Sequence, residues 1–366
     1  MAKYIYTLLL SISLLLSGCQ SIEQLSIDYI LPAEVSFPAS LKRVAVVNNM
    51  PAVPDNKLIV NEEEQKKSEN EITRLTNFYN GDAKLTTESL AEALAKENYF
   101  EEVVICDSAL RSKDISPRET MLTQEEVSEL VEDLGVDFLI ALENIQIRSL
   151  RKISYINEWS TYYGTVDVKV FPTVKVYLPN RRGPMVTVNS NDSIFWEDYG
   201  GGEAVLRARL INENDLIKEA SEFAGTVPVK HLLPYWKTAN RYYITGGSVN
   251  MRDAAVYAKE GQWDNAIKLW KSSYESKKGK KKMYAAFNIA LGYEMQDSIE
   301  TAMEWALKAQ SIAREIDKID ELQVTSGVNS ESIPNYFLTT IYVNELQERK
   351  EGIARLNVQM NRFEED

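Results

Sequence analysis

The sequence predicts an α+β protein in two parts, a sheet-containing amino-terminal domain followed by an all-helical domain. Three observations support this prediction. Short apolar runs alternate with helix-periodic stretches over residues 41–147, valines alternate with polar residues over 166–170, and a repeated helical pattern occupies 249–313. Alternating strands and helices favour a βαβαβ arrangement, whereas a period of two indicates an antiparallel meander with one buried face.

An uncharged apolar stretch, residues 4–16, follows Lys3 at the start of the chain. As a helix it would reach ~20 Å, short of the ~30 Å hydrocarbon core of a membrane. It therefore favours a signal peptide over a membrane span.

The leader ends in Ser17 and Gly18, directly before Cys19. This ending resembles the lipobox of bacterial lipoproteins, which implies that residues 1–18 are removed and that Cys19 carries lipid. The alternative is an ordinary secretory leader with a chance cysteine. Several acyl chains, at ~0.8 kcal/mol per buried methylene, would make a lasting membrane anchor. Gln20, by resemblance to the sorting rules of Gram-negative lipoproteins, implies an outer-membrane location that faces the periplasm, with surface exposure as the alternative.

The chain is acidic, with a net charge of −13 and a pI near 4.9. This charge argues against nucleic acid as a partner and against a basic membrane-binding patch, so lipid is expected to supply the anchoring. Cys19 and Cys106 are the only two cysteines. A lipidated Cys19 would leave Cys106 without an intramolecular partner, and its apolar surroundings favour a buried, inert thiol.

Residues 19–40, which contain Pro32 and Pro38, are predicted as a tether. The α/β domain is expected over residues 41–200, with a polar loop or surface helix inserted at 55–71. Its βαβαβ part comprises strands at 43–49, 103–106 and 136–147, a helix from Thr87, and a helix that begins at the capping box Thr123–x–x–Glu126. This part resembles the amino-terminal α/β domains of envelope proteins such as the curli-secretion lipoprotein and the Tol-system propeller protein.

The meander continues the predicted sheet. Strands are expected at 166–170 and 173–178, with Pro172 between them, and a turn at 179–184 leads to a returning strand at 186–196. The glycine run at 200–202 lacks the order of a dinucleotide-binding loop and the lysine of a P-loop, so it favours a flexible joint. A linking helix and connector follow at 203–248.

The helical domain is expected over residues 249–366 and carries an internal repeat. Two sets of residues keep the same spacing of 3, 4, 2, 3, 4 and 3, offset by 36 residues: Ala254, Tyr257, Gly261, Trp263, Ala266, Trp270 and Ser273, and then Ala290, Tyr293, Asp297, Ile299, Ala302, Ala306 and Ala309. This pattern resembles the tetratricopeptide repeat, whose usual period is about 34. A degenerate third pair is expected to cap the array, with Ser332 and Pro334 at the start of one helix and a last helix at about 350–363.

Two groups of side chains in this domain are candidate contacts. A partner groove would be lined by Tyr257, Trp263, Trp270, Asn288, Tyr293 and Trp305, although the three tryptophans are better explained as core between repeats. A basic segment in the linker offers Lys277, Lys278, Lys280, Lys281 and Lys282 to an acidic partner, a lipid headgroup or an anionic glycan, or is simply a solvated loop.

No catalytic, metal-binding or cofactor-binding signature is found in the sequence. His231 is the only histidine, and no CxxC, HExxH, EF-hand or GxSxG pattern is present. A carboxylate pair of glycosidase type has no fixed spacing in sequence, so a hydrolase is not excluded by these absences. Glu197 and Asp198, which follow Trp196, would be its candidate residues. We expect a protein that is not an enzyme and needs no cofactor.

Taken together, the lipobox, the α/β domain and the tetratricopeptide-like helices resemble an uncharacterised lipoprotein family common in Bacteroidota. The first functional hypothesis is a membrane-anchored scaffold that holds a protein or peptide in the helical groove. The alternative is a glycan-binding or glycan-processing envelope lipoprotein. It would use aromatic side chains of the meander: Trp159, Tyr162, Tyr163 and Trp196.

Overall fold

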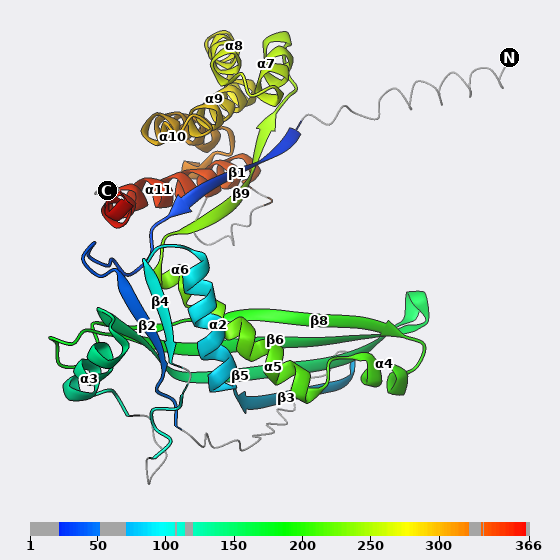
Figure 1. The fold of residues 1–366 in the computed structure, drawn as a ribbon. Helices are drawn as coiled ribbons and strands as arrows, with labels where there is room; N and C mark the ends of the chain where they lie inside the picture. Colours follow the sequence, from blue (N-terminus) through cyan, green and yellow to red (C-terminus); the bar gives the residue numbers. More distant parts are fainter. Residues whose placement is uncertain are drawn as a thin grey trace. The chain divides into compact units, whose positions relative to one another are not determined.

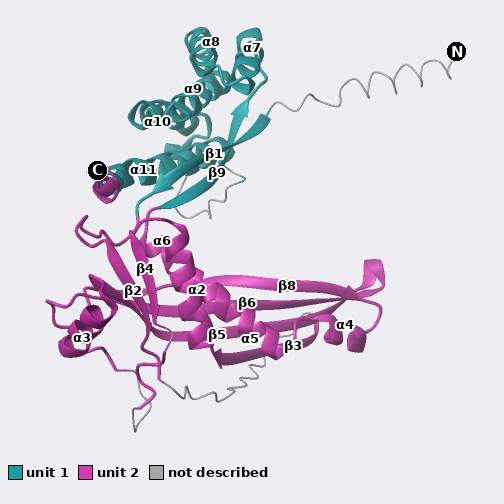
Figure 2. Ribbon diagram, viewed as in Figure 1, with its two compact units in different colours: residues 1–32, 235–357 teal, residues 33–234, 358–366 magenta. Residues whose placement is uncertain are grey.

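The computed structural model describes residues 22–51, 71–106, 108–113, 120–321, 331 and 333–363. The chain forms two compact units, each built from segments that lie far apart in sequence (Figure 2). The sheet unit comprises residues 33–234 and 358–366, and the helical unit comprises residues 1–32 and 235–357. Lipid attachment at Cys19 lies outside the described residues.

Parallel strands form one half of the sheet. Strand β2 (Arg43–Asn48) lies between β4 (Glu102–Cys106) and the first part of β5 (Phe138–Ile156), and pairs in parallel with both. Helices α2 (Ala83–Lys96) and α3 (Gln124–Leu134) make the connections. Residues 44–47 are fully buried because alternate side chains enter two different hydrophobic clusters, one on each face. The predicted βαβαβ arrangement is confirmed.

The second half of the sheet is antiparallel, as predicted, but its strands differ in detail (Figure 1). Strand β3 (Glu71–Asn80), which the sequence pattern does not reveal, pairs with the second part of β5. Strand β6 (Thr161–Tyr177) pairs with β5 along its whole length. The expected single returning strand is divided into β7 (Val186–Asn189) and β8 (Asp192–Gly200), which pair with opposite ends of β6.

Pro172 does not interrupt strand β6, contrary to the prediction. It lies opposite Ile145, beside a register shift between Leu142 and Asn144 of the neighbouring strand. A proline cannot donate a ladder hydrogen bond, and strands accept it where pairing is irregular. Its carbonyl still accepts a hydrogen bond from the Ser190 N–H at 3.2 Å.

Three helices after the glycine run belong to the sheet unit and not to a connector. They are α4 (Glu203–Arg209), α5 (Glu213–Thr226) and α6 (Val229–Leu232). Leu206, Ala220 and Ala224 are fully buried in the main cluster of the sheet unit. The apolar periodicity is therefore as expected, but it covers one face of the sheet.

The helical unit also contains a two-stranded sheet. Strand β1 (Ile22–Leu31) pairs antiparallel with β9 (Tyr235–Ile244), from Ile22 opposite Ile244 to Leu31 opposite Tyr235. All of β1 falls within residues 19–40, where a tether is predicted, so that prediction is wrong for these residues. Its side chains alternate, and Ile27, Tyr29 and Leu31 are buried while their even-numbered neighbours are more exposed.

The two predicted helix pairs are present as α7 (Val249–Lys259), α8 (Trp263–Ser276), α9 (Gly279–Glu294) and α10 (Ile299–Ile316). Ala254, Ala266, Ala290 and Ala302 are fully buried between them. The third pair is not formed, because α11 (Pro334–Met360) is one continuous helix. Pro334 begins it as expected, whereas the proposed cap Ser332 lies outside the described residues.

Candidate binding surfaces

Three helices of the helical unit bring lysines and aromatic rings together. We call this set the lysine–aromatic surface: Lys271 and Tyr274 of α8, Lys282 and Tyr293 of α9, and Trp305 and Lys308 of α10. Trp305 lies at its centre and meets Tyr274 edge to face, with ring centroids 5.0 Å apart. Five of the six side chains are half-buried, and Lys308 is exposed.

Lysine ammonium groups lie over the aromatic rings of this surface. Lys308 Nζ is 4.1 Å from the ring centroid of Trp305, and Lys282 Nζ is 4.5 Å from that of Tyr274. Lys271 Nζ donates a hydrogen bond to the Tyr293 hydroxyl at 2.7 Å. Cation–π contacts of this kind contribute about 0.5–1 kcal/mol each at exposed sites, so they orient the lysines without removing their charge.

The lysines of this surface have no carboxylate partners among the described residues. None of Lys271, Lys282 and Lys308 forms an ion pair there. The same holds for the other four lysines of the predicted basic segment: Lys277, Lys278, Lys280 and Lys281. The result is a local excess of positive charge in a chain of net charge −13.

The basic segment is not the loop that the sequence suggests. Gly279, at a φ of +55°, begins helix α9, so Lys280, Lys281 and Lys282 occupy its first turn. Glycine adopts that left-handed backbone without a steric penalty. The helix macrodipole adds further positive potential at this end.

The six predicted groove residues do not form one surface. Trp270 and Asn288 are fully buried and are not accessible to a partner. The Asn288 side chain instead binds strand β9, where it accepts from the Ile244 N–H at 2.9 Å and donates to the Ile244 carbonyl at 2.7 Å. Tyr293 and Trp305 lie in the lysine–aromatic surface, while Tyr257 and Trp263 are half-buried elsewhere on the unit.

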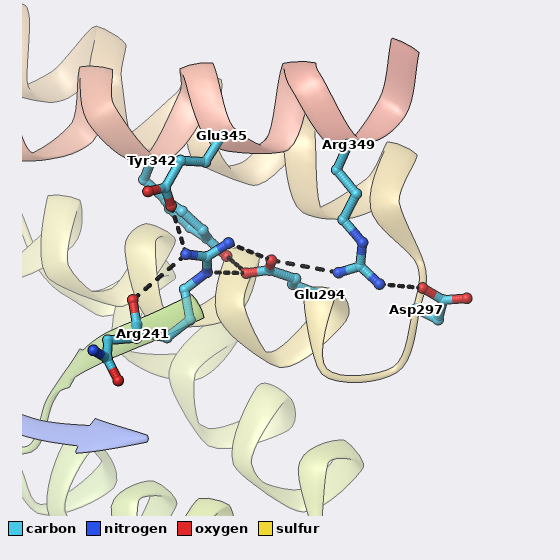
Figure 3. A network of polar contacts seen from close by, with 7 residues as sticks. Arg241, Glu294, Asp297, Tyr342, Glu345 and Arg349 are labelled. Atoms are coloured by element: carbon cyan, nitrogen blue, oxygen red, sulfur yellow. Dashed lines mark hydrogen bonds and ion pairs between the residues drawn. The ribbon is translucent and has the colours of Figure 1, made fainter. Parts of the chain in front are cut away.

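A buried charge network fixes α11 to β9 and α9 in the helical unit (Figure 3). Glu294 is 1% exposed and accepts two hydrogen bonds from Arg241, both at 2.9 Å, and one from the Tyr342 hydroxyl at 2.8 Å. Arg241 also contacts Glu345 at 2.5 Å, and Arg349 approaches Glu294 at 3.4 Å. Burial and the Glu294 carboxylate raise the pKa of the Tyr342 hydroxyl. Since the buried carboxylate is fully compensated, we interpret the network as structural.

The antiparallel end of the sheet exposes a second set of aromatic side chains. We call it the aromatic sheet face: Trp159, Tyr163, Phe171, Phe195 and Tyr199. Trp159 and Phe195 are each 66% exposed, and the rings of Tyr163 and Tyr199 are 4.8 Å apart. Helices α4 and α5 pack on the opposite face, where the even-numbered residues of β6 are buried.

The aromatic residues predicted for glycan contact are divided between the two faces of the sheet. Trp159 and Tyr163 belong to the aromatic sheet face, whereas Tyr162 and Trp196 pack against the core. Glu197 and Asp198 are also neighbours on one strand, so their carboxylates point to opposite faces. This arrangement contradicts their pairing as acid and base. Glu197 instead accepts a hydrogen bond from Tyr163 at 2.5 Å, which raises the pKa of Tyr163 to about 12.

A polar cluster that sequence reasoning missed lies where the parallel strands end. Glu143 is 4% exposed and accepts hydrogen bonds from Tyr177 at 2.7 Å, Asn49 at 3.1 Å and Lys175 at 3.4 Å. Burial, followed by the Glu143 carboxylate, raises the pKa of the Tyr177 hydroxyl. Ligands often bind at this edge of an α/β sheet. Here Glu143 is satisfied from within the chain, which indicates an internal brace.

His231 and Cys106 are the remaining residues with reactive side chains among those described. His231 contacts Glu34 at 2.7 Å near the surface of the sheet unit, and Cys106 is half-buried at the end of β4. Within the described ranges, no group of three or more histidine, cysteine or acidic residues could hold a metal ion. None of the described helices combines the length and apolar character needed to cross a membrane.

The described residues form an α+β protein of two compact units. A family model described as a domain of unknown function, DUF8603, matches residues 41–244, which is more than half of the chain. The protein therefore belongs to the DUF8603 family. A second domain of unknown function, DUF6340, matches residues 252–348. Comparisons with curated proteins and with solved structures found no match.

Proposed function

We propose that this protein is a non-catalytic scaffold of the bacterial cell envelope that binds an acidic protein or peptide segment on its lysine–aromatic surface. It is a lipoprotein of Bacteroidota type, held in the outer membrane by lipid on Cys19 and facing the periplasm. It uses no cofactor and no nucleic-acid partner.

The observation that carries the proposal is the group of lysines around Trp305 that have no carboxylate partner in the part of the chain that the structure describes. Like charges gathered on one surface repel one another, and a partner carboxylate would relieve that repulsion. The rings hold Lys271, Lys282 and Lys308 in place, which lowers the entropy lost on binding. An extended acidic segment with an aromatic residue would match both the charge and the rings.

Site-specific crosslinking in intact cells tests the proposal. A photoreactive amino acid replaces Lys308 on the lysine–aromatic surface or, as a control, Lys350 on α11 of the same unit. Both positions are exposed lysines. We expect position 308 to crosslink to an acidic segment of one partner and position 350 to give no such product. Equal products from both positions would contradict the proposal.

A second candidate function is glycan binding on the aromatic sheet face. The favouring observation is that Trp159 and Tyr199, 66% and 42% exposed, lie with ring centroids 6.2 Å apart beside the carboxylate of Glu197. Aromatic rings offer stacking faces to sugars and carboxylates accept sugar hydroxyl hydrogen bonds. Glycan-array binding that is lost in Trp159→Ala and kept in Trp236→Ala, a 68% exposed tryptophan of the helical unit, would favour this function.

A further inference from the structure

An open pocket lies beside the first residues of strand β1 in the helical unit. Its volume is about 800 Å³. Its walls are the start of β1, the end of β9, the turn between α7 and α8, and Met295. Ile22, Gln24 and Tyr242 line it from one face of the β1–β9 ribbon, and Tyr243 points to the other face, toward the helices; Lys259 and Trp263 complete the lining.

Apolar, aromatic and basic residues line this pocket. Ile22 is 50% exposed and Tyr242 is 46% exposed. Lys259 is exposed and forms no ion pair among the described residues, while Trp263 is half-buried at the pocket wall. We call Ile22, Gln24, Tyr242, Lys259 and Trp263 the anchor-side surface.

Two carboxylates beside this surface accept hydrogen bonds from neighbouring side chains. Glu23 accepts a hydrogen bond from the Tyr243 hydroxyl at 2.7 Å, and Glu260 accepts one from Gln262 at 3.1 Å. Burial, followed by the Glu23 carboxylate, raises the pKa of Tyr243. Tyr243 therefore stays neutral at physiological pH and adds no negative charge to the pocket.

The length of chain before β1 limits how far this surface can be from the anchor. Cys19 precedes Ile22 by three residues. A fully extended chain spans at most ~3.6 Å per residue, so the two Cα atoms are no more than about 11 Å apart. The headgroup region on each side of the hydrocarbon core is itself several ångströms thick. A lipid on Cys19 therefore leaves no room for a long tether.

We infer that the anchor-side surface rests on the phospholipid headgroups of the leaflet that holds the lipid. Tryptophan and tyrosine are enriched at this depth, a lysine can pair with a phosphate, and Ile22 can enter the acyl boundary. The charge of −13 favours a zwitterionic leaflet over a strongly anionic one. The inference rests on the proposed lipidation of Cys19.

Depth-dependent fluorescence quenching tests this contact on the full-length lipidated protein. Cys106→Ser removes the other thiol, and an environment-sensitive dye is attached at Tyr242→Cys or at Gln24→Cys, its register partner on β1. Leu307→Cys on α10, where the native side chain is 47% exposed, is the control. The protein is inserted in phosphatidylethanolamine–phosphatidylcholine vesicles that contain a spin-labelled lipid.

We expect dyes at 242 and 24 to be quenched about twofold more than the dye at 307, because an interfacial group sits within ~5–10 Å of the acyl boundary. Vesicle flotation and the mass of the amino-terminal peptide report the anchor independently. Lipidated protein that floats but shows equal quenching at all three positions overturns the membrane contact alone. Protein without lipid that stays in solution overturns both the anchor and the contact. Circular dichroism confirms that each labelled variant is folded.

Discussion

The side-chain amide of Asn288 pairs with both backbone groups of Ile244, through its oxygen at 2.9 Å and its nitrogen at 2.7 Å. An asparagine that the repeat pattern places toward a partner thus binds a strand of its own chain. Strand β9 thus takes up the hydrogen-bonding groups of the Asn288 side chain, as a bound extended peptide would. The surface that we propose for a partner is therefore formed by other residues, those around Trp305.

Replacing Asn288 with leucine should destabilise the helical unit. Ile244 is 5% exposed, so its N–H and carbonyl would lose partners in a buried place. Each unsatisfied group costs about 1–3 kcal/mol. Urea unfolding followed by circular dichroism measures the change. Asn265→Leu, at an exposed position of α8, is the control and should change stability by less than about 0.5 kcal/mol. Equal stability of the two variants would disprove the structural role of Asn288.

The Arg241–Glu294 pair should show strong coupling. Glu294→Gln leaves the 4% exposed Arg241 without its main counter-charge, and breaking a buried pair costs about 3–5 kcal/mol. Adding Arg241→Met to that variant removes the stranded charge. We therefore expect the double variant to lose less free energy of unfolding than the sum of the two single variants. Strictly additive losses would show that the two residues act independently.

Gly225 should not tolerate alanine. A Cβ there would lie 2.6 Å from the Thr86 carbonyl oxygen and 2.7 Å from the Leu90 nitrogen, both in helix α2. Alanine normally stabilises a helix relative to glycine, but here α5 and α2 would be forced apart, at a cost of about 1–3 kcal/mol. Gly201→Ala, where a Cβ meets nothing within 4 Å, is the matched control. Thermal melts of both variants should separate them, and matching melts would refute the close approach.

Tyr163 should ionise at a higher pH than an ordinary tyrosine because its hydroxyl donates a hydrogen bond to the Glu197 carboxylate. Its pKa is raised to about 12, above the ordinary value of 10.0, so this hydrogen bond is complete below pH 10 and is lost as the pH rises toward 12. At pH 11 the tyrosine should be mostly protonated in the native protein and mostly ionised in Glu197→Gln. Carbon-13 NMR of labelled tyrosine, assigned with Tyr163→Phe, reads the two states. If the titration midpoint of Tyr163 is the same in Glu197→Gln as in the native protein, the carboxylate is not the cause of the raised pKa.

The parts of the fold that sequence predicts are those where burial leaves a clear pattern. The parallel strand β2 is apolar over consecutive residues because both faces are covered, and the capping box at Thr123 marks the start of α3. Strand β3 is not recognised from the sequence because nearly all its side chains are half-buried, so buried and exposed residues do not alternate. Strand β1 is not recognised because Pro32 and Pro38 favour a tether. Its alternation of buried and exposed side chains becomes clear once its partner β9 is known.

The candidate site could be predicted only in pieces. The lysines of the basic segment stand out by composition, and Tyr293 and Trp305 follow from the repeat. Their meeting depends on the packing of α8, α9 and α10, which brings Lys282 to Tyr274 and Lys308 to Trp305. No spacing in the sequence encodes those contacts. The same packing buries Trp270, which sequence alone cannot separate from the half-buried Trp263 and Trp305.

The most direct test of the scaffold proposal is the binding of a fluorescent oligoglutamate peptide that ends in tryptophan, measured by anisotropy. Lys271→Gln/Lys282→Gln/Lys308→Gln should weaken binding about tenfold or more, a loss of about 1.4 kcal/mol. The native affinity should also fall as salt is raised. Lys318→Gln/Lys350→Gln/Arg355→Gln, with the same change of charge on exposed basic residues elsewhere in the helical unit, should bind like the native protein. Equal affinities for the two triple variants would contradict a partner site on the lysine–aromatic surface.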